Sequence, residues 1–432
     1  MRRASVRVVL VGTLAVLTVL VLRGDEPDDD RWLPFDEGRR AVPADDVVDS
    51  VGVNTHLHYR STPYGDFEAV EAALRELGIR HIRDYPVPDN IEEVQRLASV
   101  GIRLTAIMGV PTPTDWMPHD LEDLLKSIEL MEPGVAALEG VNEWDISDDP
   151  DWVDNLRTHQ EALWQFASAR ESSIPVLAPS VTWADNMPEV GDMSNWADAG
   201  NIHPYPGGRP PEARVADDLA ANRRFVVNDK PVLVTETGYH DAFEEPHRHP
   251  GVPAGVAAIY LPRLLLHYFD IGIERTFLYE LVDQRDSSHP ESSFGLLEHD
   301  FDPKPSYEVI QALLGTLADP GQPFETGRLE FRLESDDDLL RHLLLQQRDG
   351  TFHLAVWREI SVWDRDERRM LDPGTTNVRL AIDSPAGVER ILGLEPGSVR
   401  TDQLDSSTSV ELEVGPFVQL VEIRPHEVRS GR

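Results

Sequence analysis

The sequence predicts a (β/α)₈ TIM barrel followed by a small all-β sandwich, and three observations support this α/β fold class. Short apolar runs alternate with amphipathic helical patterns from about residue 50 to residue 320, which is typical of βα units around a parallel sheet. Eight such units can be counted, which favours a closed barrel over the alternative of a doubly wound sheet. Beyond Leu317 the chain changes to alternating, β-branched and turn-rich sequence, which indicates a sandwich.

The length and composition fit two domains that are held together by packing alone. The chain has 432 residues and 41% of them are hydrophobic, which is enough for a barrel of about 250 residues and a second domain of about 100. The sequence contains no cysteine, and this excludes disulfides, thiolate catalysis and cysteine-based metal sites.

The barrel elements are expected where apolar runs precede helical patterns. The strands are placed at residues 51–54, 79–83, 104–108, 137–141, 176–178, 201–203, 232–235 and 276–279. Helices are placed at residues 67–77, 91–100, 121–131, 152–170, 254–270 and 306–317. Gly78, Gly101 and Gly272 follow three of these helices, where left-handed caps are expected. Pro305 stands where the last helix begins.

The C-terminal part of the chain has the short alternating runs of a β-sandwich. We expect its strands at residues 329–333, 339–347, 352–357, 378–382, 410–414 and 417–423. The Asp349-Gly350 pair predicts a hairpin turn between two of these runs. The domain assignment is therefore a barrel over residues 50–320 and a sandwich over residues 321–432.

The N-terminal segment has the pattern of an export signal. Arginines in the first seven residues precede an apolar run at residues 8–22, and acidic residues follow at 25–30. Residues 1–24 are therefore either a signal peptide or an N-terminal membrane anchor, and no small-x-small cleavage site decides between them. The Arg2-Arg3 pair fits twin-arginine export and also an ordinary signal peptide. Residues 25–49 are predicted to be an acidic linker.

The charge balance bears on partners and location. The formal net charge is −37, which repels phosphate backbones and excludes nucleic acid as an expected partner. The charge pattern around residues 8–22 places the body of the protein outside the cell or on the outer face of the cytoplasmic membrane. We expect a monomer.

Two glutamates are placed at the ends of predicted barrel strands. Glu143 follows the fourth strand and Glu236 follows the seventh. Functional groups of a parallel barrel lie at the carboxyl ends of its strands, so both carboxylates are expected at one mouth. Cleavage of a glycosidic bond requires such a pair, because one group protonates the leaving oxygen and the other attacks or stabilises the sugar carbon.

This arrangement resembles that of the clan A glycoside hydrolases, which are retaining enzymes on a (β/α)₈ barrel. The resemblance rests on Asn142-Glu143 and on Glu236, and it covers residues 51 to 317; the C-terminal sandwich is similar to one found in several families of the clan. It implies that Glu143 is the acid/base and that Glu236 is the nucleophile. It also implies that Asn142 binds the sugar 2-hydroxyl, and that neither a cofactor nor a metal takes part.

Further residues match the same clan. Arg83, at the end of strand two, corresponds to an arginine beside the nucleophile, and a cation there keeps a carboxylate ionised. His203 and Tyr205 match the His-x-Tyr after strand six, whose phenol contacts the nucleophile. The resemblance therefore implies a retaining hydrolase that cleaves a β-linked extracellular oligo- or polysaccharide by double displacement.

Two positions depart from the pattern of the clan and leave the sugar open. Trp144 replaces a proline that often follows Asn-Glu, and Tyr279-Glu280 stands where many members have a stacking tryptophan. Trp144 is a candidate platform for a sugar ring, as are Trp116 and Trp183, although each could instead seal a loop against the rim. Glu280 is a candidate for binding sugar hydroxyls, with a solvated loop acid as the alternative.

Other functions remain open on the sequence. Glu143 alone could cap a helix, and Glu236 could form a structural ion pair with Arg83. His56 and His58 end strand one, where metal-dependent amidohydrolases place two ligands, but strand five offers no histidine. A barrel that binds polysaccharide without cutting it is a third class, and the intact glutamate pair argues against it.

The catalytic hypothesis makes a geometric prediction. The two carboxyl groups should lie about 5 to 5.5 Å apart if the enzyme retains configuration, and about 6.5 to 9.5 Å apart if it inverts. Arg83 and Tyr205 should be within hydrogen-bond reach of Glu236, and Glu143 should have no cationic partner.

Overall fold

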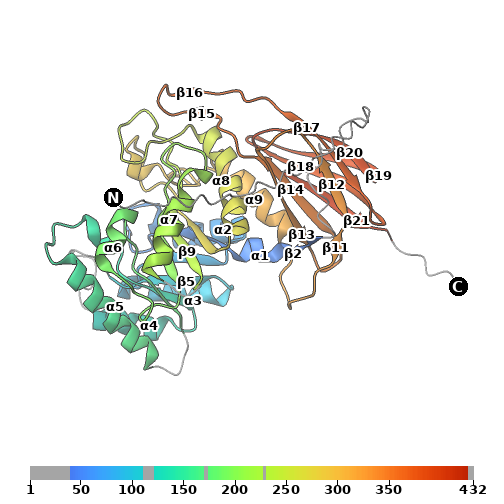
Figure 1. Ribbon diagram of the computed structural model, residues 1–432. Helices are drawn as coiled ribbons and strands as arrows, with labels where there is room; N and C mark the ends of the chain where they lie inside the picture. The colour runs from blue at the N-terminus through green and yellow to red at the C-terminus, as the bar shows by residue number, and fades with distance from the viewer. Residues whose placement is uncertain (1–38, 110–120, 170–173, 227–229, 427–432) are drawn as a thin grey trace, which may run out of the picture.

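The computed structural model describes residues 39–109, 121–169, 174–226 and 230–426, and a parallel β-barrel forms their larger half (Figure 1). Its sheet has eight strands in the order β7-β6-β5-β4-β3-β10-β9-β8. The strands are β3 (Val51–Asn54), β4 (His81–Asp84), β5 (Arg103–Ile107), β6 (Val135–Glu139), β7 (Val176–Leu177), β8 (Gly200–Ile202), β9 (Val232–Thr237) and β10 (Ile273–Leu278). A parallel bridge between Leu177 and Ala199 joins the edge strands β7 and β8. The predicted barrel is confirmed.

The barrel helices surround the strands and bury one apolar face each. They are α2 (Phe67–Leu77), α3 (Ile91–Ser99), α4 (Leu121–Met131), α5 (Trp152–Ser168), α6 (Met187–Val190), α7 (Glu212–Phe225), α8 (Ala254–Asp270) and α9 (Pro305–Leu317). The three expected glycine caps are present, because Gly78, Gly101 and Gly272 have φ values of 82°, 88° and 87°. Pro305 is the first residue of α9, as predicted.

A small apolar cluster fills the barrel interior below the mouth. It consists of Ala137, Leu177, Ala199, Leu233 and Phe277. Phe277 is the bulkiest member, and it lies against Gly52 of β3. A side chain at Gly52 would meet the ring, so the glycine provides the space that the phenyl group occupies.

We expect Gly52→Ala to destabilise the protein by about 1–3 kcal/mol, because the new Cβ would lie 2.4 Å from Phe277 Cδ1 in a packed core. Urea denaturation measures the change. Gly315→Ala in α9 is the control, since its added Cβ would have no neighbour within 4 Å apart from the backbone of its own helix and its two chain neighbours. Adding Phe277→Leu should restore part of the loss, and additive effects of the two substitutions would contradict the explanation.

The C-terminal domain consists of two packed sheets whose strands pair antiparallel, except for the edge strand β2 (Val42–Pro43), which pairs in parallel with β13. One sheet has the order β12-β17-β20, and the other has the order β19-β18-β21-β14-β13-β2. The strands are β12 (Phe331–Glu334), β13 (Leu340–Gln346), β14 (Phe352–Arg358), β17 (Thr376–Ile382), β18 (Ala386–Glu395), β19 (Ser398–Ser407), β20 (Ser409–Val414) and β21 (Gln419–Pro425). Apolar side chains from both sheets form a second core. The predicted sandwich is confirmed, but β18 and β19 were not predicted.

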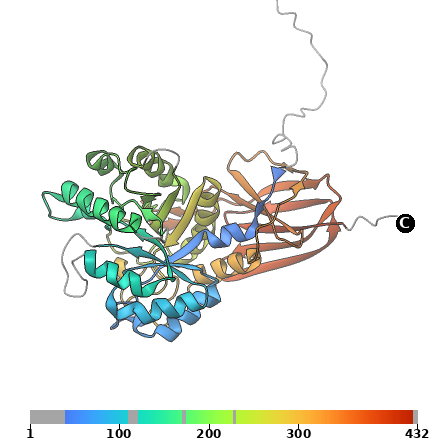
Figure 2. The ribbon, with the colours of Figure 1, turned by 90° about the horizontal axis from the view of Figure 1, so that it is seen from below.

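Residues 39–49 belong to the folded body, although the sequence places them in the linker. They form β1 (Arg39–Arg40), β2 (Val42–Pro43) and α1 (Ala44–Asp49), and β1 pairs with β11 (Arg328–Leu329). β2 pairs in parallel with β13 of the sandwich, and Figure 2 shows α1, in blue, between the barrel and the sandwich. Val47 and Val48 are buried there, which explains why this acidic stretch is ordered. Residues 1–38, with the predicted export segment, lie outside the described residues.

The part of the chain that the structure describes contains no helix long and apolar enough to cross a membrane.

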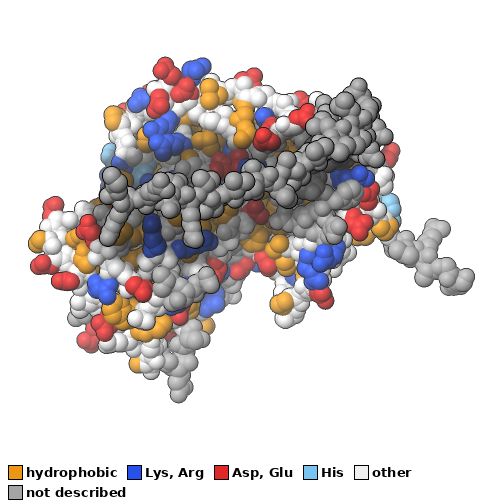
Figure 3. Space-filling view, viewed as in Figure 1, with side chains coloured by type: hydrophobic (Ala, Val, Ile, Leu, Met, Phe, Trp, Pro, Cys, Tyr) orange, Lys and Arg blue, Asp and Glu red, His pale blue; other side chains and the backbone are white. Residues whose placement is uncertain are grey.

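Acidic side chains are spread over the face in Figure 3 and are interspersed with Lys and Arg. The high negative charge is thus distributed on this face rather than gathered in one patch.

A hairpin of the sandwich domain reaches over the barrel. We call residues 360–371 the arm; it contains the short strands β15 (Trp363–Asp364) and β16 (Arg369–Met370), which pair with each other (Figure 1). The arm follows β14 and leads back to β17.

Candidate active site

A cavity of about 240 Å³ opens at the carboxyl ends of the barrel strands. It is lined by Asn54, Thr55, His56, Tyr59, Arg83, Tyr85, Ile107, Asn142, Glu143, Tyr205, Glu236, Arg248, His249, Tyr279, Glu291 and Phe294. Both predicted catalytic glutamates are in this set, as are Asn142, Arg83 and Tyr205. The lining is polar and aromatic, which suits a hydroxylated ligand.

Glu236 lies at the end of β9 and is held by three neighbouring groups. Arg83 Nη1 donates to its Oε1 at 2.6 Å, and the Tyr205 hydroxyl donates to its Oε2 at 3.0 Å. Burial acts to raise the pKa of Glu236, but the charges of His203 and Arg83 and the hydrogen bonds from Arg83 and Tyr205 outweigh it and lower the pKa to about 2. Glu236 is therefore ionised at neutral and mildly acidic pH, as predicted.

Arg83 organises the floor of the cavity from inside the barrel. Its guanidinium makes five hydrogen bonds, which go to the side chains of Glu139, Glu236, Asn142 and Asn54. A guanidinium has five N–H donors, so every donor has a partner. The planar fork thereby fixes the orientation of Glu236 relative to Asn142.

Glu143 follows β6, where the backbone turns sharply toward the cavity. It has φ 47° and ψ 49°, a left-handed conformation that is uncommon for a residue other than glycine. Its N–H donates to Ser180 Oγ at 3.1 Å, and Ser180 Oγ donates to Asn142 Oδ1 at 3.0 Å. Ser180 therefore ties the Asn142-Glu143 segment to the loop after β7.

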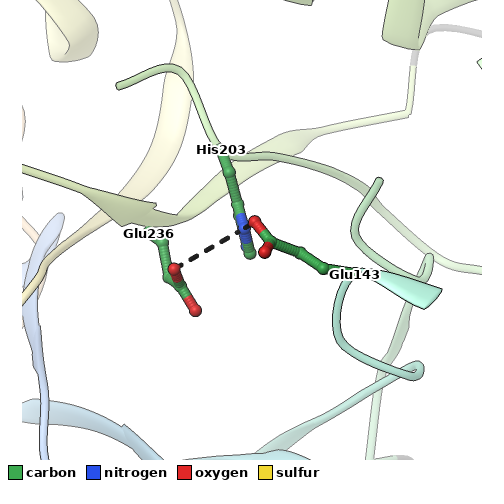
Figure 4. A group of neighbouring side chains, drawn as sticks. All are labelled: Glu143, His203 and Glu236. Carbon is green, nitrogen blue, oxygen red and sulfur yellow. Dashed lines mark hydrogen bonds and ion pairs between the residues drawn. The ribbon is translucent and has the colours of Figure 1, made fainter. Parts of the chain in front are cut away.

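His203 lies between the two glutamates (Figure 4). Its Nδ1 is 2.8 Å from Glu143 Oε1 and 3.8 Å from Glu236 Oε2, and its Nε2 contacts Thr235 Oγ1 at 2.8 Å. Burial opposes the charge on the ring, but the Glu236 charge and the hydrogen bond to Glu143 raise the pKa of His203. The expectation that Glu143 has no cationic partner is therefore wrong.

The two carboxylates are close together. One oxygen of Glu143, one of Glu236 and a nitrogen of His203 all lie within 4.8 Å of one another. The two glutamates are thus neighbours in one cavity. Asn142 Oδ1 accepts hydrogen bonds from Arg83 and Ser180, so its amide nitrogen is the group that can donate to a ligand.

Trp144 and Glu280 are not part of the cavity lining. Trp144 lies in the single turn η3 (Trp144–Ile146), and its indole N–H donates to Asp149 at 3.1 Å. Glu280 is fully buried behind His56, at 3.2 Å from its Nε2, and accepts from the Tyr64 hydroxyl at 3.0 Å. Trp183 is 44% exposed and outside the lining, while Trp116 lies outside the described residues.

Several residues of the site were not predicted from the sequence. Beneath the cavity, the Glu139 carboxylate accepts hydrogen bonds from Arg83, Asn201 and Thr235. Its negative charge compensates the positive charge of the buried Arg83 guanidinium. The sequence offered one signal for Glu139, which is that a charged residue stands at the end of the apolar run of β6. Arg248 and His249 come from the loop after β9, and nothing in the sequence indicated that this loop folds over the cavity.

His56 lines the cavity, but neither His56 nor His58 belongs to a group of described residues that is close enough to share one metal ion. His56 is placed against Glu280, and His58 Nδ1 is 3.2 Å from Asp84 Oδ1. Among the residues that the structure describes, the group close enough to share one metal ion is Glu143, His203 and Glu236. The carboxylate pair, and not the His-x-His pair, is thus the chemical centre of the cavity.

We expect Arg83→Met to lower the free energy of unfolding by about 3–5 kcal/mol, because it leaves two buried carboxylates without their cation. Chemical denaturation at neutral pH measures the loss. Arg379→Met is a matched control, since Arg379 is exposed and 3.9 Å from Glu411; it should cost less than about 1 kcal/mol. Similar losses in both variants would contradict the described role of Arg83.

Fold and site together define a (β/α)₈ barrel with a carboxylate pair at its mouth and a β-sandwich behind it. Solved structures share this architecture. A family 39 glycoside hydrolase from Bacteroides cellulosilyticus WH2 has a TM-score of 0.61 and 17% identity, over 89% of this chain and 82% of that one. A monomeric beta-xylosidase from Caulobacter crescentus CB15 has a TM-score of 0.59 and 16% identity, over 91% and 98%.

A third structure, the family 39 enzyme from Xanthomonas axonopodis pv. citri, has a TM-score of 0.59 and 15% identity, over 90% of this chain and 96% of that one. No family model and no curated sequence matches the chain. At this level of identity the likeness establishes the shared fold, including the attached sandwich.

Proposed function

We propose that the protein is a retaining glycoside hydrolase. The observation that carries the proposal is the pair of glutamates at the ends of β6 and β9, with carboxylate oxygens within 4.8 Å in a polar cavity. Such a close approach of one oxygen from each carboxylate suits a pair that acts directly on one sugar carbon, as a retaining pair does.

In the proposed mechanism Glu236 attacks the anomeric carbon while Glu143 protonates the leaving oxygen. The C–O bond to the leaving group breaks, and a covalent glycosyl-enzyme forms on Glu236. Glu143 then takes a proton from water, which attacks the same carbon and releases Glu236. The contacts of Glu236 with Arg83 and Tyr205 support the nucleophile role, because they favour its ionised form.

His203 orients the carboxyl group of Glu143. Its hydrogen bond fixes one oxygen of Glu143, so the other oxygen is available to the leaving group. The Asn142 amide is suited to donate to a sugar hydroxyl next to the reacting carbon. No metal or cofactor is required by these steps.

The substrate we propose is a β-linked oligo- or polysaccharide outside the cell. One structure of the same fold is a beta-xylosidase, which supports a β-linked sugar. The apolar run at residues 8–22 supports export, with either a cleaved peptide or a retained anchor, and the net charge argues against nucleic acid as a partner. We propose a monomer as the working form.

A screen of aryl glycosides and polysaccharides tests the proposal. We expect release of sugar from a β-linked member with retained anomeric configuration, observed by NMR at early times. Glu143→Gln should release sugar from natural substrates at least about 10²-fold more slowly. Binding without turnover would favour a carbohydrate-binding barrel instead.

We expect EDTA to leave the activity unchanged, because the proposed chemistry uses carboxylates alone. The rate before and after chelation is the measurement. Complete loss of activity that zinc restores would overturn this mechanism and favour metal-assisted hydrolysis.

A further inference from the structure

The loop between β9 and α8 covers the cavity, and we call its residues 238–253 the roof. His249 stacks on Tyr205, with ring centroids 4.7 Å apart and an angle of 26°. Tyr205 in turn donates to Glu236. Arg248 lines the cavity and its Nη2 lies 4.0 Å from Glu143 Oε2. The position of the roof therefore affects the surroundings of both glutamates.

The arm of the sandwich holds the roof from outside the barrel. Arg368 Nη1 donates to the Glu244 carbonyl at 3.0 Å, and the Trp363 ring packs edge-on against Phe243 at 5.5 Å. Trp363 is buried, although it lies in a hairpin that projects from its own domain. The contacts join the arm to the first half of the roof.

Arg365 reaches the second half of the roof through a pair of glycines. Its Nη1 donates to the Gly207 carbonyl at 3.3 Å. A Cβ added at Gly208 would lie 3.4 Å from Arg365 Cβ and 3.1 Å from the Pro250 carbonyl oxygen. Gly207 and Gly208 have positive φ values of 60° and 77°, so this close approach suits glycine. The glycine pair is thus packed between the arm and the roof, two residues after Tyr205.

The base of the arm is fixed on α8, the helix that follows the roof. Arg263 is fully buried and its Nη1 donates to the Ile360 carbonyl at 2.7 Å. The Val362 N–H donates to the Tyr260 hydroxyl at 3.0 Å. The arm therefore has a rigid base on the barrel as well as contacts at its tip.

We propose that the arm positions the roof, so that the C-terminal sandwich sets the geometry of the active site through Arg365 and Arg368. The inference rests on the proposed hydrolase function. Arg365 and Arg368 are positioning residues, because they act through His249 and Arg248 rather than on the substrate. A displacement of about 1 Å in a positioning element can cost up to about 10²-fold in rate.

Kinetics of the Arg365→Ala/Arg368→Ala double variant test the inference. We expect kcat/KM to fall by about tenfold, with an unchanged melting temperature. Arg369→Ala is the matched control, since Arg369 lies in the same hairpin, is 64% exposed and contacts Asp364 at 3.4 Å; its kcat/KM should stay within about twofold of wild type. Arg365→Lys, in a chain that keeps Arg368, should retain most of the activity. Lysine keeps the aliphatic part of the side chain and an N–H group that can donate to the Gly207 carbonyl. An unchanged kcat/KM in the double variant would overturn the proposal.

A double-mutant cycle identifies the route. Arg365→Ala and His249→Ala should each lower kcat/KM, and together they should lower it little more than His249→Ala alone, because one acts through the other. Arg369→Ala with His249→Ala should be additive. Additive losses for the Arg365 and His249 pair would show that the arm does not act through the roof.

Hydrogen exchange separates this inference from the proposed function. The Val252 N–H bonds to the His240 carbonyl at 3.0 Å inside the roof, and its exchange should accelerate about tenfold in the double arm variant but not in Arg369→Ala. This result is independent of any substrate. Unchanged exchange across residues 238–253 would overturn the inference even if the wild-type protein hydrolyses glycosides, whereas faster exchange without hydrolysis would overturn only the proposed function.

Discussion

Glu236→Gln is expected to reduce hydrolysis of every substrate by about 10⁴-fold or more, since an amide cannot form the glycosyl-enzyme. The reason is specific to this site: Arg83 and Tyr205 hold the carboxylate ionised, and the amide has neither the charge nor the nucleophilicity. Steady-state rates on an aryl glycoside and on a natural glycan measure the loss, with circular dichroism to confirm folding.

Glu274→Gln is the matched control for this prediction. Glu274 is an exposed residue of β10, the strand next to β9 in the barrel sheet. Its substitution should leave the rate within about twofold of wild type. A folded Glu236→Gln protein with more than about a tenth of the wild-type rate would remove Glu236 from the role of nucleophile.

Glu143→Ala is expected to show a loss that depends on the leaving group. Natural glycans should lose about 10²–10⁴-fold in rate, because their leaving oxygen needs a proton, whereas substrates with activated phenols should retain much of their bond-cleavage rate. The measurement is kcat/KM for a series of aryl glycosides whose leaving phenols differ in pKa. The decrease of log kcat/KM with the pKa of the phenol should be steeper in the variant than in the wild type.

An external nucleophile provides a second readout. Azide should accelerate turnover of the activated substrates by Glu143→Ala, because it needs no general base to attack the glycosyl-enzyme. The same addition should leave Glu236→Gln inactive. Equal losses on activated and natural substrates would mean that Glu143 is not the acid/base.

The barrel was predictable from the sequence because its signals are local. Each helix of the prediction has an apolar stripe and several end at a glycine, and α2, α4 and α8 begin and end at the predicted residues. β3 (Val51–Asn54) also has its predicted bounds, and the other barrel strands differ from expectation by up to three residues at an end. The reason is that a continuous apolar run marks a buried strand without marking its ends.

The sandwich was less predictable where its strands are polar. β19 is an edge strand of mostly exposed side chains, and its residues 398–407 have the composition of a loop. Its pairing with β18 gives it order that no local pattern indicates. The same reasoning applies to residues 39–49, whose order depends on contacts with the far end of the chain.

The catalytic pair was predictable because strand ends carry functional groups in a parallel barrel, and Glu143 and Glu236 stand at such ends. The contacts that hold these two glutamates in place could not be predicted from the sequence. Glu139 becomes meaningful only when Arg83 is seen to contact it, and His203 was expected near the site but not between the glutamates. Arg248 reaches the cavity from a loop whose path depends on the arm.

The pairing of β2 with β13 has a consequence for the order of folding during synthesis. Val42 pairs with Leu345, so the two partners are 345 − 42 = 303 residues apart. At about 5–20 residues per second, a ribosome needs about 15–60 s to deliver the second partner after the first. β2 is made before the barrel and can take its place in the sheet only after the barrel is complete. The barrel can therefore form on the ribosome while β2, which precedes it in the chain but belongs to the sandwich sheet, still lacks its partner β13.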